Sequence, residues 1–292
     1  MNNGPMIFLG AFFALAVSWV GFVLTPQIQV GREMQQTNIV NTAELYPQPL
    51  PGEAHQGMEV YRANGCMYCH SQDVQQTGTV CDIVLTDAGT NSATAWDALL
   101  KIKPALSEKS MKTFFAALPK TILHGVDRDT ANEAAKALKA AGAKADLNIV
   151  PVGPDITRGW GKRGTVAADY LYDWPVMLGS LRIGPDLANV GLRRPDANWQ
   201  LMHLYDPQSL VKGSAMPPYR FLFETRRIES TRSLDALPLT GKLAPPPGYE
   251  VVPRPEASEL VAYLSSLHAE TPLRVAPFTV PPAAPTNAPA AK

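Results

Sequence analysis

The sequence predicts a mainly α-helical protein that begins with a membrane-spanning helix and carries a small α/β insert with the element order β-α-α-β-α-β. Three patterns favour this fold class: an uncharged apolar run at the N-terminus, helical apolar faces over residues 53–64 and 257–267, and alternating strand and helix patterns between residues 79 and 150. The chain has 292 residues, room for one or two domains, and no net charge, so its composition does not indicate a nucleic-acid partner.

The N-terminal apolar run covers residues 6–24 and contains no charged residue. A helix of about 19 residues rises about 28 Å, close to the hydrocarbon thickness of a bilayer. A cleaved signal peptide is the alternative, but residues 1–5 contain no Lys or Arg and residues 24–26 offer no small-x-small cleavage site. We therefore expect residues 1–30 to form an uncleaved anchor in the lipid bilayer.

A C-x-x-C-H motif, made of Cys66, Cys69 and His70, is the pattern that attaches a c-type haem. Two thiols about one helical turn apart can bond the two haem vinyl groups, and the histidine that follows can ligate the iron. A zinc site would need a second ligand pair, and the sequence has no other Cys-x-x-Cys and no His-x-x-His. The motif predicts one covalent haem c with His70 as an iron ligand. Cys81 is left over and is expected to be a small buried residue, with a redox or disulfide role as the alternative.

The sixth iron ligand is expected to be Met216, because the prolines that follow it stiffen its loop. His203 is the next candidate, and simple loop packing is the alternative role of Met216. Gly184-Pro185-Asp186-Leu187 resembles the Gly-Pro-x-Leu loop of class I cytochromes c, in which the proline carbonyl accepts a hydrogen bond from the ligating histidine. The helices over 53–64 and 257–267 resemble the first and last helices of that fold.

The order of these motifs over residues 1–76 and 155–270 resembles the monohaem cytochrome c subunit (subunit II) of cbb(3)-type, C-family haem–copper cytochrome c oxidases. That family has its haem domain in the periplasm on a single-pass anchor in the bacterial inner membrane. The resemblance implies electron transfer from a multihaem cytochrome c subunit or a soluble cytochrome c to a catalytic haem b/copper subunit, where oxygen is reduced. Arg182 and Tyr219 are the expected partners of the haem propionates, together with Arg220. Two alternatives stay open: a subunit of a related complex such as nitric oxide reductase, and a haem-based sensor.

The expected organisation is an anchor (1–30), a linker (31–52), a class I cytochrome c domain (53–78 and 151–270), an α/β insert (79–150) and a Pro/Ala-rich tail (271–292). Prolines in residues 46–51 and 244–253 predict a semi-rigid spacer and an extended crossing. Within the insert we expect strands over 82–86, 120–123 and 144–150, and helices over 93–101, 107–118 (with Ser107 as N-cap) and 127–141. Residues 80–150 resemble the C-terminal domain of the bacterial ribosomal stalk protein, without its factor-binding pattern. The insert is expected to be either a packed decoration of the haem domain or a docking surface.

Overall fold

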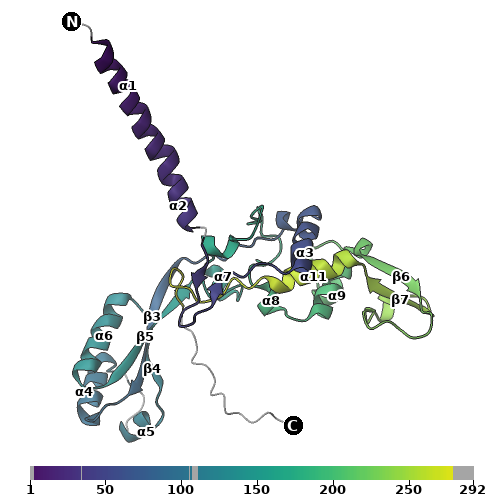
Figure 1. The fold of residues 1–292 in the computed structure, drawn as a ribbon. Coiled ribbons are helices and arrows are strands. Elements are labelled where there is room, and N and C mark those ends of the chain that lie inside the picture. The colour runs from purple at the N-terminus through teal and green to yellow at the C-terminus, as the bar shows by residue number, and fades with distance from the viewer. Residues whose placement is uncertain (1–2, 34, 105, 107–110, 279–292) are drawn as a thin grey trace.

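The computed structural model describes residues 3–33, 35–104, 106 and 111–278. A single helix projects from an elongated body, and a compact α/β unit lies to one side of that body (Figure 1). The described chain is a mixed α/β protein rather than a mainly α one, because a three-stranded sheet and two short antiparallel pairs join the helices.

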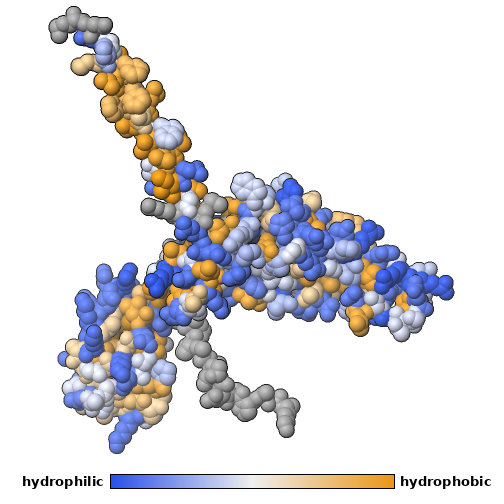
Figure 2. Space-filling model, in the orientation of Figure 1, coloured by the Kyte–Doolittle hydropathy of each residue, from blue (hydrophilic) through white to orange (hydrophobic). Residues whose placement is uncertain are grey.

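The N-terminal helix is continuous from α1 (Gly4–Trp19) through a π-helical turn (η1, Val20–Leu24) to α2 (Thr25–Glu33). Within its stretch Gly4–Gly31 the most apolar window of 18 residues has a mean hydropathy of 2.4 and no buried residue, so by length and composition this helix can cross a membrane. Figure 2 shows apolar side chains along its length. The wide turn accommodates Pro26, which has no N–H to donate, because the N–H of Thr25 bonds the carbonyl of Val20 instead.

The segment predicted as a spacer is packed rather than extended. After α2, strand β1 (Thr37–Asn38) pairs antiparallel with β2 (Leu45–Tyr46), and Pro47 is buried. The first part of the tail is packed as well: Leu273 is fully buried, and the carbonyl of Pro272 accepts a hydrogen bond from the N–H of Val40 at 3.1 Å. The rest of the predicted tail, residues 279–292, lies outside the described residues.

The body is organised by two crossing helices, α3 (Gly52–Ala63) and α11 (Pro255–Ser266). At the crossing a Cβ on Gly57 would lie 1.8 Å from the carbonyl oxygen of Glu259, so only glycine allows this approach. Short elements connect the two helices: η2 (Cys66–Tyr68), α7 (Pro154–Thr157), η3 (Ala167–Tyr170), α8 (Val190–Arg193), α9 (Ala197–Tyr205), α10 (Pro207–Leu210), η4 (Arg220–Leu222) and η5 (Gly241–Leu243).

An antiparallel pair of strands forms the end of the body. The second half of the segment predicted as a crossing, residues 244–253, belongs to one of these strands. Strand β6 (Phe223–Arg227) pairs antiparallel with β7 (Tyr249–Pro253). Val251 and Val252 are buried, so the prolines preceding this segment lead into a strand that contributes to the core. The signal in the sequence was the short run Val251-Val252 of β-branched residues.

The insert has the predicted element order: β3 (Gly78–Asp87), α4 (Ser92–Ile102), α5 (Met111–Ala116), β4 (Lys120–Val126), α6 (Arg128–Ala140) and β5 (Lys144–Val152). The sheet order is β4-β3-β5, with both pairs antiparallel. Cys81 is buried with Ile83 and Leu85 in the insert's own core, as expected for a small apolar residue. Asp127 caps α6 as predicted, whereas Ser107 lies outside the described residues.

The stem of the insert leads directly into the region around His70. Strand β3 begins at Gly78 and strand β5 ends at Val152, and these two residues are paired. The N–H of Thr77 donates a hydrogen bond to the carbonyl of Val152 at 2.9 Å. The two hydrophobic clusters, one in the insert and one in the body, share no residue. The insert is therefore held by its stem and has a core that does not depend on the body.

Candidate haem-attachment site

The C-x-x-C-H segment follows directly from helix α3. Gly65 has a φ of +68°, which turns the chain out of α3 into the short helix η2. The N–H groups of Cys69 and His70 both bond the carbonyl of Cys66, at 3.1 and 3.0 Å, so the two cysteines lie one turn apart. Both thiols are free and half-buried, and burial raises the pKa of Cys66 to about 11.

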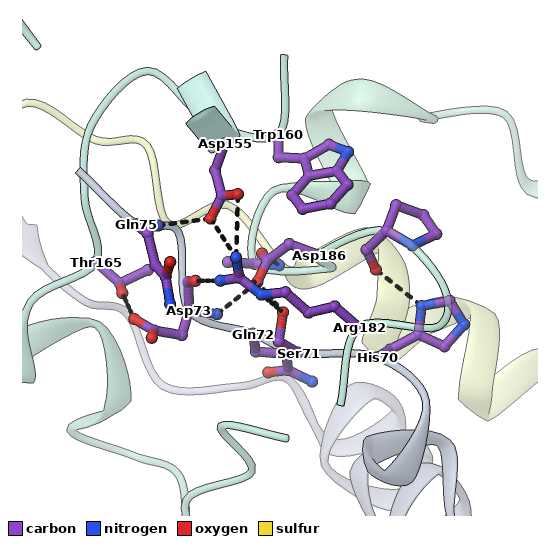
Figure 3. Close-up of polar contacts among 12 residues, drawn as sticks. His70, Ser71, Gln72, Asp73, Gln75, Asp155, Trp160, Thr165, Arg182 and Asp186 are labelled. Atoms are coloured by element: carbon purple, nitrogen blue, oxygen red, sulfur yellow. Dashed lines mark hydrogen bonds and ion pairs between the residues drawn. The ribbon is translucent and has the colours of Figure 1, made fainter. Parts of the chain in front are cut away.

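His70 is oriented by the loop in which the sequence predicted its partner. Its Nδ1 lies 2.8 Å from the carbonyl oxygen of Pro185 (Figure 3). A carbonyl can only accept, so Nδ1 carries the proton and Nε2 is the nitrogen available to a metal. Burial lowers the pKa of His70, which favours the neutral ring that ligation requires. Gly184 lies against this ring, since a Cβ there would be 2.2 Å from Cε1 of His70.

Arg182 lies beside this loop, but its guanidinium is used by the protein itself. Nε donates to Oγ of Ser71 at 2.9 Å, and Nη1 lies 2.8 Å from the fully buried carboxylate of Asp155. Nη2 donates to the carbonyl of Asp73. Figure 3 shows the side chain extending away from His70 toward Asp155. These contacts hold the residues after His70 in place, and a propionate contact of Arg182 stays a prediction.

Two buried carboxylates that sequence reasoning did not single out complete this network. Asp155 accepts from the N–H of Gln75 at 2.8 Å and so ties the stem of the insert to Arg182. Asp186 accepts from Oγ of Ser71 at 2.6 Å and from the N–H of Asp73 at 2.7 Å. Asp186 could have been found from the sequence because it follows Pro185 directly, whereas the pairing of Asp155 with Arg182 joins residues with no local pattern in common.

Met216 and Tyr219 are both half-buried and pack against the hydrophobic cluster that Cys66 also contacts. Their loop is tied to α9, because the N–H of Tyr219 bonds the carbonyl of Leu204 at 2.8 Å. Burial raises the pKa of Tyr219, and the nearby thiols of Cys66 and Cys69 add to this. The structure therefore brings the predicted sixth ligand to the same part of the body as the attachment motif.

His203 also belongs to this region. Its ring stacks on Trp199 with centroids 4.8 Å apart. Burial lowers the pKa of His203, and the neighbouring His70 lowers it further. Within the part of the chain that the structure describes, its Nδ1 is buried and has no hydrogen-bond partner.

Arg193 is a site residue that the sequence analysis missed. Nη2 donates to the carbonyl of Asp186 at 2.6 Å, whereas Nη1 is buried and finds no partner among the described residues. Its charge acts on His70, whose pKa it helps to lower. A cation with an unused donor beside the proposed iron ligand fits a haem propionate. The sequence could have indicated Arg193, because it lies two residues after Gly191, in the block that begins at Gly184.

Haem c thus fits the donor set: two free thiols one turn apart, an imidazole oriented through Nδ1, a glycine against its ring, and a nearby arginine with one buried donor that has no partner among the described residues. The described residues contain no group of three His, Cys, Asp or Glu side chains that could hold a metal ion by themselves. Residues 146–243, about a third of the chain, match the family described as cytochrome c oxidase, mono-heme subunit/FixO. The chain carries a FixO-type mono-haem subunit domain. The FixO-type match includes Arg182, Pro185 and Met216, while the C-x-x-C-H motif precedes it in the chain.

Curated relatives match a different part of the molecule. The large ribosomal subunit protein bL12 of Hyphomonas neptunium is 36% identical over 69 residues, which is 24% of this chain and 55% of the relative. The bL12 proteins of Akkermansia muciniphila and Corynebacterium aurimucosum are each 36% identical over 69 and 73 residues, covering 24% and 25% of this chain and 56% and 57% of the relatives. The chain spans about half the length of these relatives. The resemblance predicted for residues 80–150 is confirmed alongside the FixO-type domain.

Proposed function

We propose that this chain is the membrane-anchored monohaem c-type cytochrome of a cbb(3)-type cytochrome c oxidase, with a class I cytochrome c domain formed by residues 53–78 and 151–270. The observation that carries the proposal is the hydrogen bond of 2.8 Å between His70 and Pro185. This bond joins the C-x-x-C-H motif, which lies outside the family match, to the loop of the FixO-type domain that would orient an iron ligand.

In this proposal each site residue has a separate task. Cys66 and Cys69 would bond the haem covalently and His70 would ligate its iron, while Pro185 holds the proton on Nδ1 of His70. Met216 would be the second iron ligand, and its soft thioether would favour ferrous iron and raise the reduction potential. The haem supplies reversible one-electron transfer between Fe²⁺ and Fe³⁺.

Arg193 is a further proposed partner of a haem propionate, beside the expected Arg182. Its Nη1, which is buried and has no hydrogen-bond partner among the described residues, would be compensated by a carboxylate. Tyr219, which packs against the same cluster as Cys66, is retained as a second propionate partner.

The N-terminal helix places the haem domain. As a single-pass anchor in the bacterial inner membrane, it would keep the domain at the periplasmic surface, where c-type haem is attached. Anchoring raises the effective concentration of the haem near its electron acceptor. The proposed acceptor is the haem b/copper subunit that reduces oxygen, and the proposed donors are a multihaem cytochrome c subunit or a soluble cytochrome c.

Optical spectra and redox titration of the purified membrane complex test this proposal. We expect covalent haem on this chain, haem b in a copurifying subunit, and a Met216→Ala variant with a changed spectrum and a lower potential. Met202→Ala is the matched control, because Met202 packs against the same cluster. Absence of covalent haem, or of a haem b subunit, refutes the proposal. An unchanged spectrum in Met216→Ala favours a sensor, and a catalytic subunit of nitric oxide reductase type favours that related complex.

A further inference from the structure

The loop over residues 172–183, called here the apolar loop, exposes several large apolar side chains. The side chain of Trp174 is 86% exposed and that of Leu181 is 56% exposed, whereas Met177 between them is buried in the core. The remaining large apolar side chains that the loop exposes are Tyr172, Val176, Leu178 and Ile183. Several large apolar side chains exposed along one short loop are typical of an interaction site.

The apolar loop is rigidly attached to the segment that carries the haem motif. The N–H of Gln72 bonds the carbonyl of Leu178 at 2.8 Å, and the N–H of Ser180 bonds that of Met67 at 3.2 Å. Gly179 has a φ of +84°, and a Cβ there would lie 2.3 Å from the carbonyl oxygen of His70. The exposed side chains are thus presented by a preformed surface next to the haem-attachment segment, which lowers the entropic cost of binding.

The start of the apolar loop lies beside the segment that follows the N-terminal helix. Tyr46, thirteen residues after the end of α2, lies close enough to Asp169 for that carboxylate to raise its pKa, and Asp169 comes just before the loop. A cavity of about 300 Å³ separates the loop from the linker, and it is lined by Ile39, Tyr46, Tyr170, Tyr172 and Asp173 among others. An anchor inserted through the N-terminal helix would therefore hold the loop near the membrane, where a membrane subunit can contact it.

The charges of the apolar loop indicate whether its partner is a lipid surface or a protein. The loop contains no Lys or Arg before Arg182, which is already paired with Asp155. Asp173 has no ion-pair partner within the described residues, and burial raises its pKa to about 6. Peripheral binding to anionic lipid relies on basic residues, and the half-buried carboxylate of Asp173 would be repelled by such a lipid surface. An apolar protein surface that brings a cation to Asp173 would satisfy both features.

We propose that the apolar loop is the docking surface for the integral-membrane subunit that accepts the electron, with Asp173 receiving a basic side chain of that subunit. This inference rests on the proposed function and deepens it by naming the surface of contact. Its physical advantage is that the loop contacting the acceptor is hydrogen-bonded to Met67, inside the haem-attachment motif, and to Gln72, just after it.

Photocrosslinking in the assembled membrane complex tests the docking surface. We expect Trp174→p-benzoylphenylalanine to crosslink to the haem b subunit. The control is Leu234→p-benzoylphenylalanine, because Leu234 is fully exposed in the connection between β6 and β7, at the opposite end of the body. Crosslinks from position 174 to lipid alone, or none at all, would overturn the proposal.

Substitutions give an independent readout. A Trp174→Ser, Leu181→Ser double variant should keep its covalent haem and optical spectrum, yet transfer electrons to the membrane subunit about tenfold more slowly or bind it about tenfold more weakly. Leu234→Ser should change neither. Asp173→Lys should weaken binding more than Asp173→Asn, because the new lysine would face the basic side chain of the membrane subunit and repel it. Wild-type transfer and binding in the double variant would overturn the docking surface alone, whereas a haem-free unsubstituted chain would overturn the proposed function and this inference together.

Discussion

The clearest test of the site's architecture is the substitution of Arg182 by Met, which keeps the length of the side chain and removes its charge. Arg182 donates to Ser71, Asp73 and Asp155, and its side chain is only 24% exposed. The carboxylate of Asp155 is fully buried and would lose its closest cation, leaving Arg158 at 3.4 Å. The variant therefore leaves a buried charge poorly compensated.

Breaking a buried ion pair by removing one partner costs about 3–5 kcal/mol. At roughly 2–4 °C per kcal/mol for a chain of this size, the expected fall in Tm is about 6–20 °C. The matched control is Arg220→Met, whose pair with Asp206 at 2.6 Å is exposed, with the Arg220 side chain 52% accessible. An exposed pair contributes about 0.2–1 kcal/mol, so this control should lose less than about 4 °C.

Thermal unfolding of the full chain in detergent, followed by circular dichroism, measures the difference. An Arg182→Met, Asp155→Leu double variant should recover part of the lost stability, because no uncompensated charge then remains in the interior. If Arg182→Met unfolds within 1 °C of Arg220→Met, Arg182 does not hold the segment after His70 and the reasoning is wrong.

Three further predictions concern other parts of the molecule. Gly184→Ala should reduce the yield of covalently bound haem, assayed by its absorption after denaturation, because the new Cβ would displace the ring of His70; Gly52→Ala, at an open position, should not. Burial raises the pKa of Asp173 to about 6, so the folded state binds this proton more tightly than the unfolded state does. The isolated chain should therefore lose about 2–3 kcal/mol of stability as the pH rises from about 4 to 6. Asp173→Asn should remove this pH dependence, measured by unfolding at each pH. Leu138→Ala should destabilise the insert by about 2–5 kcal/mol, seen as faster hydrogen exchange in α6, while a change in the haem spectrum would contradict the separation of the two cores.

Several features could be predicted because they depend on neighbouring residues alone. The spacing of Cys66, Cys69 and His70 sets which groups share one turn, and the uncharged run over 6–24 sets the length of the apolar helix. The insert's elements follow from their periodicity, with Asp127 and Gly142 marking the two ends of a strong helix. The Gly184-Pro185 loop was predicted from resemblance, and its contact with His70 is present in the structure.

Tertiary structure alone decided which charges pair and which surfaces remain open. Nothing near Arg182 in the sequence indicates Asp155 as its partner, because the two meet only where the stem of the insert folds against the loop that leads to Pro185. The unused donor of Arg193 is likewise visible only once its neighbours are placed. The same holds for the pairing of β1 with β2 and the burial of Pro47, within the segment predicted to be a linker. Local patterns specify elements and motifs, whereas burial and long-range pairing depend on the complete packing of the chain.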